Sequence, residues 1–135
     1  MTVRYLLDTN ICIYIRRQNP PKILARFQRL RHGEAAISII TYGELHYGAK
    51  KSQSSERGLK ELQALMTALP VMPMPVAAGS SYGEIRADLE RWGEIIGGND
   101  LWIAAHAKSE KLILVTNNER EFRRVSGLTI ENWTT

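Results

Sequence analysis

Tyr5-Leu6-Leu7-Asp8-Thr9-Asn10 is a short apolar run that ends in three small polar residues. The run begins at Val3 and carries β-branched and aromatic side chains, which predicts a buried strand. Open α/β sheets bind ligands just beyond the carboxyl ends of their strands. We therefore expect the carboxylate of Asp8 to serve a function, because a buried strand end is a costly place for a charge.

The composition is that of one soluble globular domain, residues 1–135. The chain has 135 residues, 44% of them hydrophobic and 24% charged, and no apolar run long enough to span a membrane. No signal peptide is recognisable, and the single cysteine, Cys12, cannot form an internal disulfide, so we expect a cytoplasmic protein. The net charge of +4 indicates an anionic partner such as nucleic acid, or only a charge that aids solubility.

The hydrophobic pattern alternates between strands and helices. Strands are predicted at 3–7, 35–39, 71–74, 112–115 and 128–130. Helices are predicted at 11–17, 20–31, 40–49, 58–69, 76–92 and 100–110, with a turn at 97–99. This order predicts an α/β fold, in which a central, mostly parallel sheet of four to five strands is flanked by helices.

Three carboxylates lack the charged neighbours that surface acids usually have. Asp8 ends a predicted buried strand, Glu44 has no charged residue three or four positions away, and Asp100 begins the most apolar helix. Buried carboxylates that converge repel one another, and a divalent cation with hard oxygen ligands relieves that repulsion. The alternative is structural: Asp8 and Asp100 as helix caps, and Glu44 as an ordinary exposed glutamate.

A fourth acidic position is expected after the strand at 112–115. Thr116, Glu119 and Glu121 all lie there, again beyond the carboxyl end of a strand. Ion pairing with neighbouring arginines is a competing explanation for the two glutamates. Those arginines are Arg120, Arg123 and Arg124.

Four stretches together resemble the PIN-domain ribonucleases. They are LLDTN at 6–10, SIITYGELHYGA at 38–49, NDLWIAAHA at 99–107 and VTNNEREF at 115–122. More narrowly, their order and spacing are similar to the VapC toxins of bacterial toxin–antitoxin pairs. Each motif alone is weak, and the specificity lies in their succession.

The resemblance implies a set of site residues. The catalytic acids would be Asp8, Glu44, Asp100 and Glu121, with Mg²⁺ or Mn²⁺ held by Asp8 and Asp100. The hydroxyls of Thr9 and Thr116 would orient the pocket, and that of Ser38 would orient Glu44. The fourth acid departs from the pattern, because many relatives have aspartate where this chain has Asn118. That departure leaves Glu119 as the alternative to Glu121.

The resemblance also implies an activity and partners. The activity is metal-dependent hydrolysis of RNA, of transfer RNA or alternatively messenger RNA, with 5′-phosphate and 3′-hydroxyl products. The partners are a VapB-like antitoxin, a second copy of the chain, and operator DNA through the antitoxin only. A groove for the antitoxin is expected along an apolar stripe, with core packing as the alternative; the stripe is Ile11, Ile15, Ile23, Leu24 and Phe27.

Other readings receive less support. A degenerate PIN fold that binds RNA or protein without cutting is favoured only by Asn118, and an aspartyl-phosphate enzyme would have a second aspartate where this chain has Asn10. The residues that would bind RNA are not apparent, although the arginine-rich segment 16–31 can follow a phosphate backbone or simply be solvated. His106, Trp92 and Trp133 are interpreted as packing residues, with base stacking as the alternative for the tryptophans.

Overall fold

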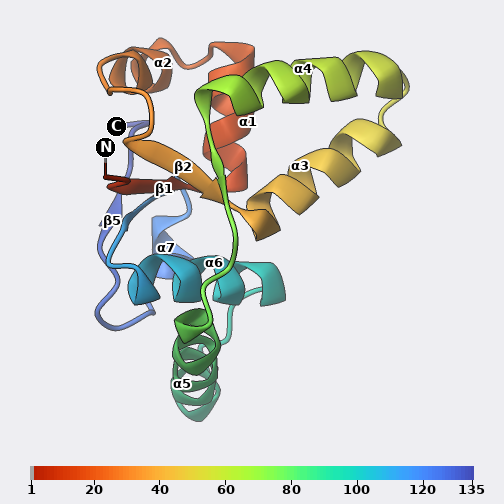
Figure 1. Ribbon diagram of the computed structural model, residues 1–135. Coiled ribbons are helices and arrows are strands. Elements are labelled where there is room, and N and C mark those ends of the chain that lie inside the picture. Colours follow the sequence, from red (N-terminus) through yellow and green to blue (C-terminus); the bar gives the residue numbers. More distant parts are fainter. Residues whose placement is uncertain (1) are drawn as a thin grey trace.

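A parallel five-stranded sheet forms the centre of the molecule (Figure 1). The computed structural model describes residues 2–135. The strands lie in the order β3-β2-β1-β4-β5. Their bounds are β1 (Tyr5–Leu7), β2 (Ala35–Ser38), β3 (Val71–Met72), β4 (Ile113–Val115) and β5 (Ile130–Glu131).

The strand β1 lies in the middle of this sheet, as the apolar run predicts. It pairs with β2 on one side and with β4 on the other, and Leu7 is in register with Val115. All three residues of β1 are buried. Because successive side chains of a strand point to opposite faces, Leu6 packs in one core cluster while Tyr5 and Leu7 pack in the other.

Helices cover both faces of the sheet, which gives three layers (Figure 1). The cluster around Leu7 includes side chains of α1 to α4, and the cluster around Leu6 includes side chains of α5 to α7. Within residues 2–135 the helices are α1 (Thr9–Arg17), α2 (Pro21–Gln28), α3 (Ile39–Lys51), α4 (Ser55–Ala68), α5 (Ala77–Arg91), α6 (Gly98–Ser109) and α7 (Glu119–Phe122). The predicted α/β architecture is confirmed.

Several predicted boundaries were wrong. The helix predicted at 58–69 begins at Ser55, and the one predicted at 20–31 ends at Gln28. The predicted turn at 97–99 is in part the first turn of α6, which begins at Gly98, and α7 was not predicted as a helix at all. The strand predicted at 71–74 stops at Met72, because prolines follow at 73 and 75.

The apolar stripe predicted as an antitoxin groove belongs to the core. Ile11 and Ile23 are fully buried and Ile15 is 5% exposed, so these three side chains face the sheet and not a partner. Packing, the alternative, is therefore correct for them. In the part of the chain that the structure describes, no helix is long and apolar enough to cross a membrane.

The other packing predictions have mixed outcomes. Trp133 is buried, as predicted, and so is Cys12. His106 is fully buried, but neither of its ring nitrogens has a hydrogen-bond partner, so it is not the satisfied packing residue that we expected. The prediction for Trp92 was wrong, since its side chain is 49% exposed.

Candidate active site

Asp8 lies at the carboxyl end of β1 and is buried, with 6% of its surface exposed. One carboxylate oxygen, Oδ1, accepts a hydrogen bond from the backbone N–H of Ile11 at 3.0 Å, which makes Asp8 the N-cap of α1. The other oxygen accepts a hydrogen bond from the hydroxyl of Thr116, beyond β4. The pKa of Asp8 is raised to about 6, mainly by burial and in addition by the charges of Asp100 and Glu44, whereas the two hydrogen bonds lower it.

Glu44 lies on α3, and two neighbouring elements hold its carboxylate. The hydroxyl of Thr9, at the start of α1, donates to Oε1, and the side-chain amide of Asn99, on α6, donates to Oε2 at 3.3 Å. From the sequence, Thr9 was expected to orient the pocket but was not assigned to Glu44, and Asn99 was missed. The available signal was the position of Asn99 directly before Asp100, in the turn predicted at 97–99.

Asp100 is the third residue of α6 and does not cap this helix. Gly97 is the N-cap residue, and no side chain makes a capping hydrogen bond there. The alternative explanation of Asp100 as a helix cap is therefore wrong. A carboxylate in the first turn is nonetheless favoured by the helix dipole. Burial raises the pKa of Asp100, and the nearby charges of Glu121 and Glu44 raise it further.

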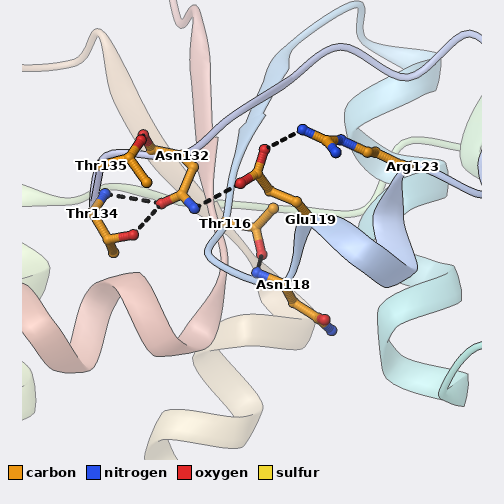
Figure 2. A network of polar contacts seen from close by, with 7 residues as sticks. All are labelled: Thr116, Asn118, Glu119, Arg123, Asn132, Thr134 and Thr135. Atoms are coloured by element: carbon orange, nitrogen blue, oxygen red, sulfur yellow. Dashed lines mark hydrogen bonds and ion pairs between the residues drawn. The ribbon is translucent and has the colours of Figure 1, made fainter.

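The two glutamates of α7 have different surroundings, and Figure 2 shows those of Glu119. Glu119 accepts hydrogen bonds from Arg123 and from the amide of Asn132, both at 2.9 Å. Glu121 makes no ion pair among residues 2–135, and its charge acts on Asp100. The arginine pairing considered for both glutamates therefore applies to Glu119.

Thr116 connects the end of β4 to this cluster. Its hydroxyl donates to Asp8 and accepts a hydrogen bond from the backbone N–H of Asn118 at 2.9 Å. The side chain of Asn118 extends away from that hydroxyl (Figure 2). Ser38, expected to orient Glu44, instead caps α3, because its hydroxyl accepts from the backbone N–H of Ile40 at 3.2 Å.

The four carboxylates share one electrostatic environment without a basic partner. The charges of Asp100 and Glu44 act on the pKa of Asp8, and those of Glu121 and Glu44 act on the pKa of Asp100, so Glu44 lies near both aspartates and Glu121 lies near Asp100. Across residues 2–135, none of these four forms an ion pair with lysine or arginine. In the same residues, no three His, Cys, Asp or Glu side chains are gathered tightly enough to hold a metal ion by themselves.

A groove of about 290 Å³ leads away from the carboxylates between α1, α3 and α4. Thr9 and Glu44 line the end near the site, and the charged residues farther along are Arg16, Arg57 and Glu61. Arg57 pairs with Glu61 at 3.1 Å, so Arg16 is the side chain that places positive charge next to the acidic cluster. Such a charge suits a ligand with phosphate groups. A separate hollow of about 510 Å³ beside α2 contains none of the four carboxylates.

The PIN-domain model matches residues 5–128, which include all four carboxylates. The chain belongs to the PIN-domain family. This PIN domain is 44% identical over 97% of its length to ribonuclease VapC2 of Haemophilus influenzae, and covers 98% of that protein. It is equally similar, with the same coverage, to the tRNA(fMet)-specific endonuclease VapC of Shigella flexneri. The resemblance to VapC ribonucleases is thereby confirmed.

Solved structures agree with this assignment. The PIN domain superposes on the crystal structure of VapBC2 from Rickettsia felis, bound to a DNA fragment from its promoter, with a TM-score of 0.90 and 40% identity. The match covers 98% of this chain and 99% of the chain in that structure. The fold of a VapC protein is therefore present from the first strand to the last.

Proposed function

We propose that this PIN domain is an endoribonuclease that hydrolyses RNA phosphodiester bonds with Mg²⁺ or Mn²⁺ as cofactor. One observation carries the proposal: Asp8, Glu44, Asp100 and Glu121 lie near the carboxyl ends of the strands, and none of them forms an ion pair with a basic side chain among residues 2–135. Burial raises the pKa of Asp8 and Asp100, and the neighbouring negative charges raise both pKa values in addition. A site of this kind favours a divalent cation and, through it, a phosphate.

The carboxylates fit Mg²⁺ in the way that this ion is usually bound. Mg²⁺ keeps several water molecules and takes only one or two carboxylates from a protein, so a tight cluster of three acids is not required. We assign Asp8 and Asp100 as its ligands. The bound ion supplies positive charge that lowers the pKa of water and stabilises the negative charge that develops on the phosphate.

The other residues of the site either orient the carboxylates or accept a proton. Thr116 orients Asp8, while Thr9 and Asn99 orient Glu44 through their hydrogen bonds. We assign Asp100 or Glu121 as the acceptor of the proton that the attacking water loses.

The relatives indicate the substrate and the partner. Two of them are described as tRNA(fMet)-specific endonucleases, so we propose transfer RNA as the substrate class. Similar solved structures are VapBC complexes, two of them with DNA. We therefore propose that a cognate VapB-like antitoxin inhibits this chain, that the chain forms a homodimer, and that only the antitoxin contacts operator DNA.

Incubation of the purified, antitoxin-free protein with total RNA tests the proposal. We expect cleavage with Mg²⁺ or Mn²⁺, none with a chelator, and fragments with 5′-phosphate and 3′-hydroxyl ends. Asp100→Asn should lower the cleavage rate by about 100-fold or more while the circular dichroism spectrum is retained. RNA binding without any metal-dependent cleavage would instead select a degenerate binding module, and full activity of a folded Asp100→Asn protein contradicts the assignment.

A further inference from the structure

The loop between α5 and α6, residues 92–97, exposes two large apolar side chains. Trp92 is 49% exposed and Ile95 is 48% exposed, although both belong to residue types that normally pack inside a small domain. The other two tryptophans differ: Trp102 stacks on Tyr82 at 3.9 Å between ring centroids, and Trp133 is 4% exposed. Trp92 is therefore the tryptophan whose ring is available to a ligand.

Trp92 is exposed although hydrogen bonds and a buried side chain hold the backbone of its loop in place. Gly93 adopts a left-handed conformation with φ of 67°, and the backbone N–H of Glu94 donates to the carbonyl of Leu89 at 2.8 Å, which closes the end of α5. The guanidinium of Arg124 donates to the carbonyl of Ile95 at 3.2 Å. Ile96 is buried, so the loop is also attached to the core near its C-terminal end.

Both attachments of this loop lead to the carboxylates. The loop ends at Gly97, the N-cap of the helix that carries Asp100, and Arg124 lies one turn after Glu121. Gly97 follows Trp92 by five positions, so at about 3.6 Å per position the backbone of Trp92 lies within about 18 Å of that of Gly97, which precedes α6. That span corresponds to a few nucleotides of an extended RNA strand.

We infer that Trp92 stacks an unpaired nucleobase of the RNA strand that lies across the carboxylates, which makes it a substrate-binding residue of the proposed nuclease. The inference rests on the proposed function for the identity of the ligand. An indole ring accepts any base on its flat face, and such stacking contributes without sequence preference. Arg91 lies beside the ring with its side chain 66% exposed, but its guanidinium pairs with Asp88, so the inference rests on the ring of Trp92 and not on this charge.

A second copy of the chain fits this surface less well. Stable protein interfaces bury at least about 1,000 Å² and need contiguous apolar area. Here the two apolar side chains are separated by Gly93 and the charged, exposed Glu94. The apolar area is thus small and interrupted, which suits one base and one ribose better than a protein face.

Binding of a fluorescein-labelled 12-nucleotide oligoadenylate, followed by fluorescence anisotropy, tests the inference. The Asp100→Asn background prevents cleavage of the probe. In this Asp100→Asn background, Trp92→Ala should weaken binding of the oligonucleotide about tenfold. Trp92→Phe keeps an aromatic face, so its affinity should stay within about threefold of the background protein. The matched control is Tyr47→Ala on α3, which removes a 65% exposed aromatic ring outside the loop and should leave affinity unchanged.

Tryptophan fluorescence gives a second readout of the same contact. Unlabelled oligoadenylate should quench the emission of the Asp100→Asn protein, and Trp92→Phe should lose most of this quenching while it still binds the RNA. In the otherwise native chain, Trp92→Ala should raise KM for RNA about tenfold and leave kcat within about twofold, because Trp92 is remote from the reacting phosphate.

Three results would overturn the inference: unchanged affinity of Trp92→Ala, RNA binding without quenching of Trp92, or a loss of affinity that parallels dissociation of the protein in sedimentation velocity. The last result would identify the loop as a self-association surface. Failure of the native protein to cleave RNA would overturn the proposed function instead, since the oligoadenylate measurement does not depend on catalysis.

Discussion

Asp8 combines a structural and a functional role in one side chain. Its Oδ1 caps α1 and its Oδ2 receives the hydroxyl of Thr116, so the carboxylate is held in a fixed position. Two hydrogen bonds do not compensate for its burial, and its pKa is raised from 3.8 to about 6. The residue that organises the site therefore destabilises the fold when it is ionised.

This conflict predicts a pH-dependent effect of Asp8→Asn on stability in the absence of divalent cations. Below about pH 3.8 the native carboxyl is protonated in both states; between 3.8 and 6 the unfolded state ionises first, which lowers the free energy of unfolding. Asn carries no charge and has no such loss. From pH 4 to pH 7.5, the free energy of unfolding of Asp8→Asn should therefore rise relative to the native protein by about 2 kcal/mol, measured by urea denaturation.

Mn²⁺ provides the control for this measurement. The ion should stabilise the native protein at pH 7.5, where Asp8 is ionised, and this stabilisation should be lost by pH 5, where protons compete for the carboxylate. Asp8→Asn should show much weaker stabilisation at either pH. A stability difference between the two proteins that does not change with pH would contradict a raised pKa for Asp8.

At the scale of elements, the short helix α7 presents its two glutamates to different surroundings. Glu119 is held by Arg123 and by Asn132, at the end of β5 (Figure 2). Glu121 acts on Asp100. One turn of helix thus separates an acid that attaches α7 to the C-terminal segment from an acid that belongs to the carboxylate cluster.

The matched pair Glu119→Gln and Glu121→Gln tests this division. Glu121→Gln should lower the rate of RNA cleavage by about 100-fold with little change in stability. Glu119→Gln should retain cleavage and lose at most about 1 kcal/mol of stability, because its ion pair is partly solvated. The measurements are initial rates with total RNA and urea denaturation, and an equal loss of activity in both variants would contradict the assignment of the fourth acid.

At the scale of the whole molecule, β1 joins the two cores. Leu6 packs with α5, α6 and α7, and Leu7 packs with α1 to α4. Both side chains are fully buried, so two consecutive residues of one strand each contribute to the core on a different face of the sheet. The polar end of the same strand then places Asp8 where elements from both layers meet.

Leu6→Ala and Leu7→Ala should therefore each lower the free energy of unfolding by about 2–5 kcal/mol, through lost burial and the cavity left behind. Because the two side chains share one central strand, each variant should still unfold in a single transition. Val76→Ala, at a position that is 97% exposed, is the control and should change stability by less than about 0.5 kcal/mol. Urea denaturation measures all three, and separate transitions for the two cores would contradict a single cooperative domain.

Local pattern was sufficient for the class of fold and for most of the elements. Apolar runs of strand length and periodic helices identified β1 and the alternation of layers, and the four motifs identified the PIN-domain family. The polar residues near the strand ends also gave three acids as candidates for the site. The physical reason is that apolar residues on a buried face recur along the sequence with the period of the helix or strand. Boundaries were less accurate, since caps such as Asp8 and helix starts such as Gly98 depend on hydrogen bonds that local pattern does not specify.

Tertiary structure decided how the side chains use those positions. Only the packing of α3 against α1 and α6 shows that Thr9 and Asn99, and not Ser38, hold Glu44. Only the approach of β5 to α7 separates Glu119 from Glu121, two residues with equal charge and the same arginine-rich neighbourhood in sequence. A residue's partners come from distant segments of the chain, so the sequence by itself determined the elements and the family, whereas the fold in space decided the partners.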